Sequence, residues 1–158
     1  MNKISSFTID HTKLEPGIYV SRVDRCFPDL TVTTFDIRFK KPNVSMIDPK
    51  AAHTIEHLGA TYLRNRQLWK DQIIYFGPMG CMTGFYLIVK GEMKSKDIVD
   101  LIRDMLIFIV TFDGIVPGTT EQECGNCEFH DLVMAQKDAG EFLRMFEDFT
   151  DRNFVYPE

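Results

Sequence analysis

Residues 48–57 have the sequence DPKAAHTIEH, and this stretch decides the fold because it marks the start of a long helix. Asp48 is a residue type that is favoured at a helix N-cap. Pro49 follows at the first helical position, where the missing backbone N–H of proline costs nothing. We therefore predict a helix from Pro49 to about Arg66.

The same stretch contains an H-x-x-E-H motif. His53, Glu56 and His57 are three or four residues apart, so on a helix they share one face. Two imidazoles one turn apart can bind a single metal ion, and a carboxylate beside them can move protons at whatever the metal binds. The alternative is a core histidine, a surface histidine and an unrelated glutamate, since short motifs also occur by chance.

A strand is predicted before this helix, between Leu30 and Lys40, where β-branched and aromatic residues are frequent. Apolar residues at 35, 37 and 39 alternate with polar residues at 34, 36 and 38, the pattern of a strand with one apolar face. Asp36 and Arg38 form a charged pair on the polar face. We expect that face to be a wall of a polar site.

The other predicted elements mix strands and helices without strict βαβ alternation. They are an extended opening segment (7–11), two short strands (72–76 and 85–90) joined by a glycine-rich loop (77–84), a helix capped by Ser95 (95–112), a loop (114–127) and a helix capped by Asp131. An apolar stripe along the last helix is assigned to the core. We expect one α+β domain over residues 1–158, with an antiparallel sheet covered by helices.

Composition limits the possible partners and locations. The 158 residues carry a net charge of −5 with acidic and basic residues interleaved, so we expect no nucleic-acid partner. The first residues lack the apolar segment of an export signal. The longest apolar run, Met105 to Phe112, is too short to span a bilayer. We expect a cytoplasmic protein without a membrane partner.

Four cysteines are too few and too irregularly placed for a secreted disulfide framework. A metal site on the first helix needs a third ligand, and the candidates are Cys124, Cys127 and His130. Their C-x-x-C spacing would also suit a redox pair or half of a zinc knuckle. Chemistry alone does not choose between the two cysteines, although Gly125 leaves the backbone at Cys124 free to aim its thiolate.

Cys81 is a second candidate for chemistry, because it lies in the glycine-rich loop where small neighbours leave its sulfur accessible. A nearby metal or Arg38 could lower its pKa and make it a base or nucleophile. The alternative is an inert buried thiol.

Together these residues resemble the S-ribosylhomocysteine lyase (LuxS) family. The resemblance rests on the H-x-x-E-H motif, on Gly-Pro-Met-Gly-Cys-x-Thr-Gly at 77–84 and on the late Cys-Gly at 124–125, in that order. It covers nearly the whole chain, through segments 6–11, 35–39, 41–43, 53–65, 75–86 and 117–131. The implied fold is α+β and similar to that of inverted zincins.

The resemblance implies a role for each matching position. It places the metal ligands at His53, His57 and Cys124, the catalytic cysteine at Cys81, the catalytic glutamate at Glu56, and substrate-pocket residues at Arg38, His11 and Ser6. It also implies a homodimer with active sites at the subunit interface. This chain departs from many members at Met82 and from some at Tyr75 and Gly77, and it has an extra thiol, Cys127. None of these departures falls on a ligand or catalytic position.

The family reaction cleaves the thioether of S-ribosylhomocysteine to homocysteine and 4,5-dihydroxy-2,3-pentanedione, the precursor of the quorum-sensing signal autoinducer-2, and it also recycles methyl-cycle waste. The resemblance implies one divalent metal per subunit, with Fe(II) as the native ion. Histidine and cysteine donors suit Zn(II) and Co(II) as well.

Two other functions fit parts of the sequence. An inverted-zincin metallopeptidase shares the H-x-x-E-H motif and would take an acidic third ligand such as Glu121 or Glu123, but it gives Cys81 no role. A non-catalytic metal or redox module built on Cys124 and Cys127 would leave Glu56 and Arg38 unexplained.

Overall fold

A computed structural model describes Ile4 and residues 7–157 of the chain. Its four strands form one antiparallel sheet in the order β1-β2-β4-β3. The strands are β1 (Gly17–Phe27), β2 (Leu30–Arg38), β3 (Ile73–Pro78) and β4 (Gly84–Lys90). Strand β2 is therefore central, with β1 on one side and β4 on the other.

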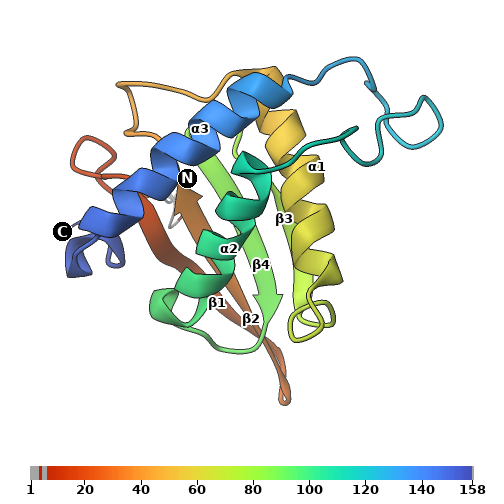
Figure 1. Ribbon diagram of the computed structural model, residues 1–158. Coiled ribbons are helices and arrows are strands. Elements are labelled where there is room, and N and C mark those ends of the chain that lie inside the picture. Colours follow the sequence, from red (N-terminus) through yellow and green to blue (C-terminus); the bar gives the residue numbers. More distant parts are fainter. Residues whose placement is uncertain (1–3, 5–6, 158) are drawn as a thin grey trace.

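Three helices cover one face of this sheet (Figure 1). They are α1 (Pro49–Asn65), α2 (Val99–Val110) and α3 (Leu132–Met145), with 3-10 turns η2 (Ser95–Ile98), η3 (Phe146–Asp148) and η4 (Asp151–Asn153). Asp48 caps α1 by accepting hydrogen bonds from the backbone N–H groups of Lys50 and Ala51. The predicted α+β class, an antiparallel sheet covered by helices, is confirmed.

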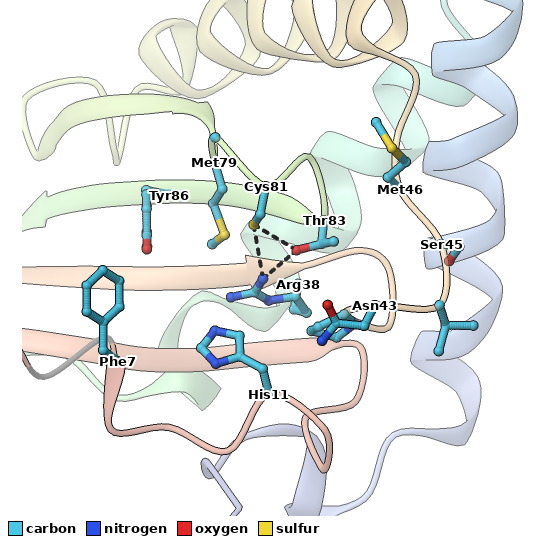
Figure 2. A pocket seen from close by; sticks show the side chains of 13 residues that line it. Phe7, His11, Arg38, Asn43, Ser45, Met46, Met79, Cys81, Thr83 and Tyr86 are labelled. Carbon is cyan, nitrogen blue, oxygen red and sulfur yellow. Dashed lines mark hydrogen bonds between the residues drawn. The ribbon is translucent and has the colours of Figure 1, made fainter.

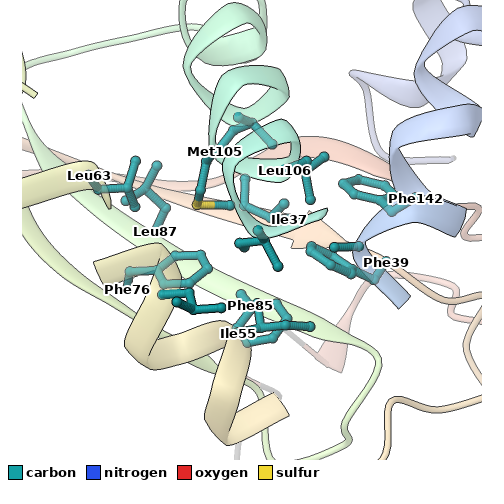
Figure 3. Packing of buried hydrophobic residues seen from close by; sticks show 14 of the residues in the cluster. Ile37, Phe39, Ile55, Leu63, Phe76, Phe85, Leu87, Met105, Leu106 and Phe142 are labelled. Carbon is teal, nitrogen blue, oxygen red and sulfur yellow. The ribbon is translucent and has the colours of Figure 1, made fainter. Parts of the chain in front are cut away.

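The core lies between the helices and the sheet, as Figure 3 shows. The predicted apolar face of β2 is confirmed, since Phe35, Ile37 and the following Phe39 are almost completely buried. Phe39 stacks on Phe142 of α3 with ring centroids 4.4 Å apart. The alternation that buries this face turns Asp36 and Arg38 to the other face of the sheet, which the helices leave free for a site.

Three local predictions need correction. Residues 7–11 form turns and bends and no strand, and the Asp10 carbonyl accepts a hydrogen bond from the Lys13 backbone N–H at 3.2 Å. The longest strand, β1, was not predicted, because its second half is charged and exposed and lacks an apolar alternation. Ser95 does not cap a continuous helix; it begins η2, and its hydroxyl donates a hydrogen bond to the Phe154 carbonyl.

Truncating Phe142 to alanine should lower the free energy of unfolding by about 3–5 kcal/mol, because it leaves a cavity against Phe39. Val133 lies on the same helix but is 75% exposed, so Val133→Ala is the matched control and should change stability by less than about 0.5 kcal/mol. Urea denaturation followed by circular dichroism measures both. Equal losses in the two variants would contradict this description of the core.

Candidate active site

Four side chains from α1 and from the loop between α2 and α3 converge on one point. One ligand atom from each of His53, His57, Cys124 and His130 lies within 4.8 Å of all the others. The Cys124 Sγ atom is 3.5 Å from His53 Nε2 and 3.9 Å from His57 Nε2. The long-range convergence of a loop thiol with two helix imidazoles is the geometry of a candidate metal centre.

Backbone carbonyls orient the two helix imidazoles. The Nδ1 atom of His53 is 2.9 Å from the Phe129 carbonyl oxygen, and that of His57 is 2.8 Å from the Pro117 carbonyl oxygen. Because a carbonyl can only accept, each Nδ1 carries the proton, and each Nε2 offers its lone pair toward Cys124. A hydrogen bond from the ring nitrogen that does not bind the metal fixes the tautomer and orientation of a metal-binding histidine. The donor set therefore fits a divalent ion that accepts nitrogen and sulfur ligands.

His130 lies beside this set in a different orientation. Its ring stacks on that of His53 with centroids 4.1 Å apart and planes 19° from parallel. A metal lies near the plane of each imidazole that binds it, so two such rings cannot bind the same ion. Burial, and then the nearby rings of His53 and His57, lower the pKa of His130 to about 4. His130 is thus a neutral neighbour of the centre.

The structure separates the two cysteines of the C-x-x-C sequence. Cys124 belongs to the convergent cluster, whereas Cys127 is outside it. Both are free thiols. Of the three candidates that the residues alone left open, the structure brings Cys124 and His130 to the helix imidazoles, and the stacking geometry favours Cys124 as the third ligand.

His53, His57 and Cys124 line a surface hollow with a volume of about 510 Å³, and Glu56 lines it as well. Its carboxylate reaches the edge strand β3, where Oε1 would lie only 3.1 Å from a Cβ atom at Gly77. Burial, and then the charge of Glu56, raise the pKa of the neighbouring Tyr75. The departures from the family at Tyr75 and Gly77 therefore shape the surroundings of Glu56.

A second hollow, of about 680 Å³, opens on the helix-free face of the sheet. Cys81, Arg38 and His11, which the family resemblance placed in the catalytic and substrate-pocket roles, all line it. In Figure 2 the Arg38 guanidinium lies between Cys81 and the ring of His11. Ser6, the remaining predicted pocket residue, lies outside the residues that the structure describes.

A tight turn between β3 and β4 presents Cys81. Met82 closes it in the left-handed region at φ 56°, and its backbone N–H donates to the Met79 carbonyl at 2.9 Å. Its own carbonyl accepts a hydrogen bond from the backbone N–H of Ile47 at 2.7 Å, which fixes the turn to the segment before α1. The thiol is left exposed at the mouth of the hollow.

Arg38 connects this thiol to a buried carboxylate. Its Nε and Nη2 atoms donate to the two oxygens of Asp36, at 3.1 and 2.5 Å. Its Nη1 atom donates to Thr83 Oγ1 at 2.5 Å and lies 3.7 Å from Cys81 Sγ. Because Thr83 Oγ1 accepts from Arg38, its own hydrogen is free for Cys81 Sγ, 3.1 Å away.

These contacts change the acidity of the thiol. Burial acts to raise the pKa of Cys81, but the hydrogen bonds from Thr83 and the positive charge of Arg38 outweigh it, so the pKa lies below the ordinary thiol value. A lowered pKa increases the thiolate fraction near neutral pH. Cys81 is thus chemically equipped to act as a base.

The sequence did not identify every residue of the two hollows. Thr83 appeared only as a letter of the Cys-x-Thr-Gly motif, and its role follows from its contacts. The carbonyls of Pro117 and Phe129 carry no residue-type signal, because any residue has one. Among the residues of one chain that the structure describes, the two hollows share no lining residue, so Cys81 and the candidate metal centre do not lie in a single cavity there.

Fold and site define a class, an α+β protein with a candidate mononuclear centre of two imidazoles and one cysteine sulfur, and with an activated thiol in a second hollow. The sequence model of the S-ribosylhomocysteinase (LuxS) family matches residues 4–152. The chain therefore belongs to this family, which confirms the resemblance.

Similar proteins span the same length. Three of them, from Desulfotalea psychrophila, Borreliella burgdorferi strain ZS7 and Porphyromonas gingivalis strain W83, bear the name S-ribosylhomocysteine lyase. The first two are each 51% identical over 99% of this chain, covering 99% and 100% of their own lengths. The third is 49% identical over the full length of both chains.

The geometry predicts different metal contents for variants of the two loop cysteines. Cys124→Ala should lose most of the one metal per chain after gel filtration, because a donor of the cluster is removed. Cys127→Ala is the matched control and should keep it, since its sulfur lies outside the cluster. Plasma emission spectrometry of anaerobically loaded protein measures the content. Retention by Cys124→Ala with loss by Cys127→Ala would reverse the assignment.

Proposed function

We propose that this protein is a metal-dependent carbon–sulfur lyase that cleaves the thioether of S-ribosylhomocysteine to homocysteine and 4,5-dihydroxy-2,3-pentanedione. The observation that carries the proposal is the Cys81 thiol, held beside Arg38 in a hollow large enough for a sugar-bearing substrate. The membership of the family and the names of its relatives point to the same reaction. We take residues 1–158 as one catalytic domain.

His53, His57 and Cys124 would hold the metal. A divalent ion bound there supplies Lewis acidity toward carbonyl and hydroxyl oxygens of the substrate. The Nδ1 contacts to the Phe129 and Pro117 carbonyls aim the Nε2 atoms of both imidazoles toward Cys124. We propose Fe(II) as the native ion on the family resemblance, and the same donors accept Zn(II) or Co(II).

The chain's own groups move the protons. The homocysteine thiolate becomes a good leaving group only when the carbon that bears sulfur lies β to a carbonyl. The carbonyl must therefore first migrate along the ribose. The Cys81 thiolate takes a carbon-bound proton and returns it to the neighbouring carbon, while Glu56 transfers protons of the oxygens. In the elimination Glu56 takes the proton from the carbon between the carbonyl and the sulfur-bearing carbon, and the electrons of that C–H bond form a C=C bond as the C–S bond breaks. The electron pair of the C–S bond leaves on the sulfur of homocysteine, which receives the proton from Glu56, and the enol product tautomerises to the dione.

Substrate positioning falls to residues on the helix-free face. Arg38 maintains the thiolate, and His11 lines the hollow opposite it. We keep Ser6 in the same role from the family resemblance. The hollow is largely apolar, and a few fixed polar groups such as Arg38 and Thr83 in such a hollow can orient a hydroxyl-bearing ligand.

The competing peptidase function finds little support in these contacts. Glu123 borders the metal hollow, but its carboxylate accepts a hydrogen bond from Thr120 Oγ1 at 2.7 Å and is not in the convergent cluster. A peptidase would also leave the lowered pKa of Cys81 without purpose. A redox module would pair Cys124 with Cys127, but both are free thiols and only Cys124 belongs to the convergent cluster.

We propose that the protein is a homodimer and that its two hollows combine across the interface. Cys81 and the metal ligands must reach one substrate, yet within one chain they line separate hollows. A two-fold symmetric pair can place the Cys81 hollow of one protomer against the metal hollow of its partner. Each dimer then contains two composite active sites.

The location and use of the product are also proposals. Among the described residues, no helix is long and apolar enough to cross a membrane. The four free thiols suit a reducing compartment, so we propose the cytoplasm. The dione can serve as the autoinducer-2 precursor for quorum sensing, and the same reaction clears a by-product of the methyl cycle.

Replacing Cys81 by alanine should reduce turnover by about 10²–10⁴-fold and leave the metal content unchanged, because a proton-transfer group is lost while the ligands remain. Homocysteine release from S-ribosylhomocysteine, detected with a thiol reagent under anaerobic conditions, measures turnover. Cys26→Ser removes an exposed thiol that lines neither hollow and should behave as wild type. If metal-loaded wild-type protein releases no homocysteine, the proposed function is rejected.

The composite site can be tested by mixing two inactive chains. Cys81→Ala and Cys124→Ala chains, co-expressed with different tags, should recover about one quarter of wild-type turnover in the mixed preparation. Half of randomly paired dimers are heterodimers, and each heterodimer has one site with an intact thiol and an intact ligand set. An active site confined to one chain would instead give no recovery in any dimer.

A further inference from the structure

The C-terminal segment, residues 151–157, is fixed against the start of β1 and against η2. The Asn153 side-chain amide donates a hydrogen bond to the Pro16 carbonyl at 2.9 Å. The Phe154 carbonyl accepts from Ser95 Oγ at 3.2 Å, and Asp151 pairs with Lys96 at 2.7 Å. These contacts deliver the next residues of the segment to the helix-free face of the sheet.

Tyr156 is the residue that reaches the sheet. Its ring stacks on Tyr19 of β1, with centroids 4.8 Å apart and planes 9° from parallel. Its hydroxyl donates a hydrogen bond to Asp36 Oδ2 at 3.0 Å. Asp36 is only 1% exposed, so a donor to this carboxylate has no water to replace it.

Asp36 in turn determines where Arg38 points. The carboxylate accepts from Nε and Nη2, the pair of donors along one edge of the guanidinium. Because the guanidinium is planar and rigid, fixing that edge directs Nη1 toward Thr83 and Cys81. The hydrogen-bonded path therefore runs from Tyr156 through Asp36 and Arg38 to the thiol.

We propose that Tyr156 is a positioning residue for the Cys81 thiol and acts through Asp36 and Arg38. Tyr156 does not line the hollow that contains Cys81. It also lies beyond residues 4–152, the part of the chain that matches the family model. The inference rests on the proposed role of Cys81 and adds the C-terminal segment to the machinery that prepares it.

Other ionisable groups also face this path, and each limits what Tyr156 can contribute. Tyr19 of β1, Tyr86 of β4 and His11 of the N-terminal segment surround Asp36. Burial raises the pKa of Asp36, while the Arg38 guanidinium and the Tyr156 hydroxyl favour its ionised form. Around Cys81 the facing groups are Arg38 and Tyr86.

Loss of the Tyr156 hydroxyl should reduce the stabilisation of the Cys81 thiolate. Asp36 Oδ2 would keep only one donor, so the carboxylate could rotate and release the edge of Arg38 that it holds. Nη1 would then be held less firmly beside Thr83 and Cys81. The thiol would ionise at higher pH than in the wild type, which is the direction that the experiment must show.

The experiment uses metal-loaded, full-length protein and compares Tyr156→Phe with Tyr19→Phe. Both variants remove one hydroxyl from the same stacked pair of rings, but the Tyr19 hydroxyl donates to the Glu15 carbonyl and not to Asp36. Iodoacetamide alkylation of Cys81 is followed against pH by mass spectrometry of its peptide. At pH values below the midpoint of the wild-type alkylation profile, Tyr156→Phe should lower the rate of Cys81 alkylation by about twofold to fivefold. Tyr19→Phe should leave this rate unchanged.

Turnover provides the second readout. With S-ribosylhomocysteine, Tyr156→Phe should lower kcat by a similar factor and leave KM unchanged, because Tyr156 does not line the hollow. Identical alkylation profiles of wild type and Tyr156→Phe, or equal shifts in both variants, would overturn the proposal. Alkylation needs no substrate, so a wild-type protein that releases no homocysteine would reject the proposed function without changing the outcome for Tyr156.

Discussion

The buried ion pair between Asp36 and Arg38 is the interaction on which the site depends. The two side chains are 2% and 4% exposed, and breaking such a pair by removing one partner costs about 3–5 kcal/mol because a charge is left buried and unpaired. Its location follows from strand geometry, since Phe35 and Ile37 turn into the core and their neighbours turn out. The same strand thus supplies the hydrophobic layer and the electrostatic centre of the Cys81 hollow.

Helix α1 divides its surface in a comparable way. Ile55 and Leu58 are buried against the sheet, while His53 and His57 face the loop that precedes α3. The imidazoles are aimed by carbonyls of that loop, so neither partner forms the site alone. The candidate centre therefore forms between helix α1, which supplies the two imidazoles, and a loop, which supplies the thiol and the backbone carbonyls that orient the imidazoles.

The sequence predicted those parts of the molecule that residue type and spacing determine. Asp48-Pro49 specified the start of α1, and the alternation at 35–39 specified the two faces of β2. The motif residues His53 and Cys81 were identified as candidates, but their separation into two hollows was not predicted. The sequence did not predict β1, whose second half is charged and is held by pairing with β2. Nor could it predict the tautomers of the histidines or the contact of Tyr156 with Asp36, because these depend on backbone carbonyls and on segments joined only by the fold.

The loop between α2 and α3 has little regular structure, yet it supplies the Pro117 carbonyl, the Cys124 thiol and the Phe129 carbonyl. An ion that bridges Cys124 to the imidazoles of α1 would cross-link this loop to the helix and lower its conformational entropy relative to the chain without bound metal. Ion capture and ordering of the loop then form one linked equilibrium.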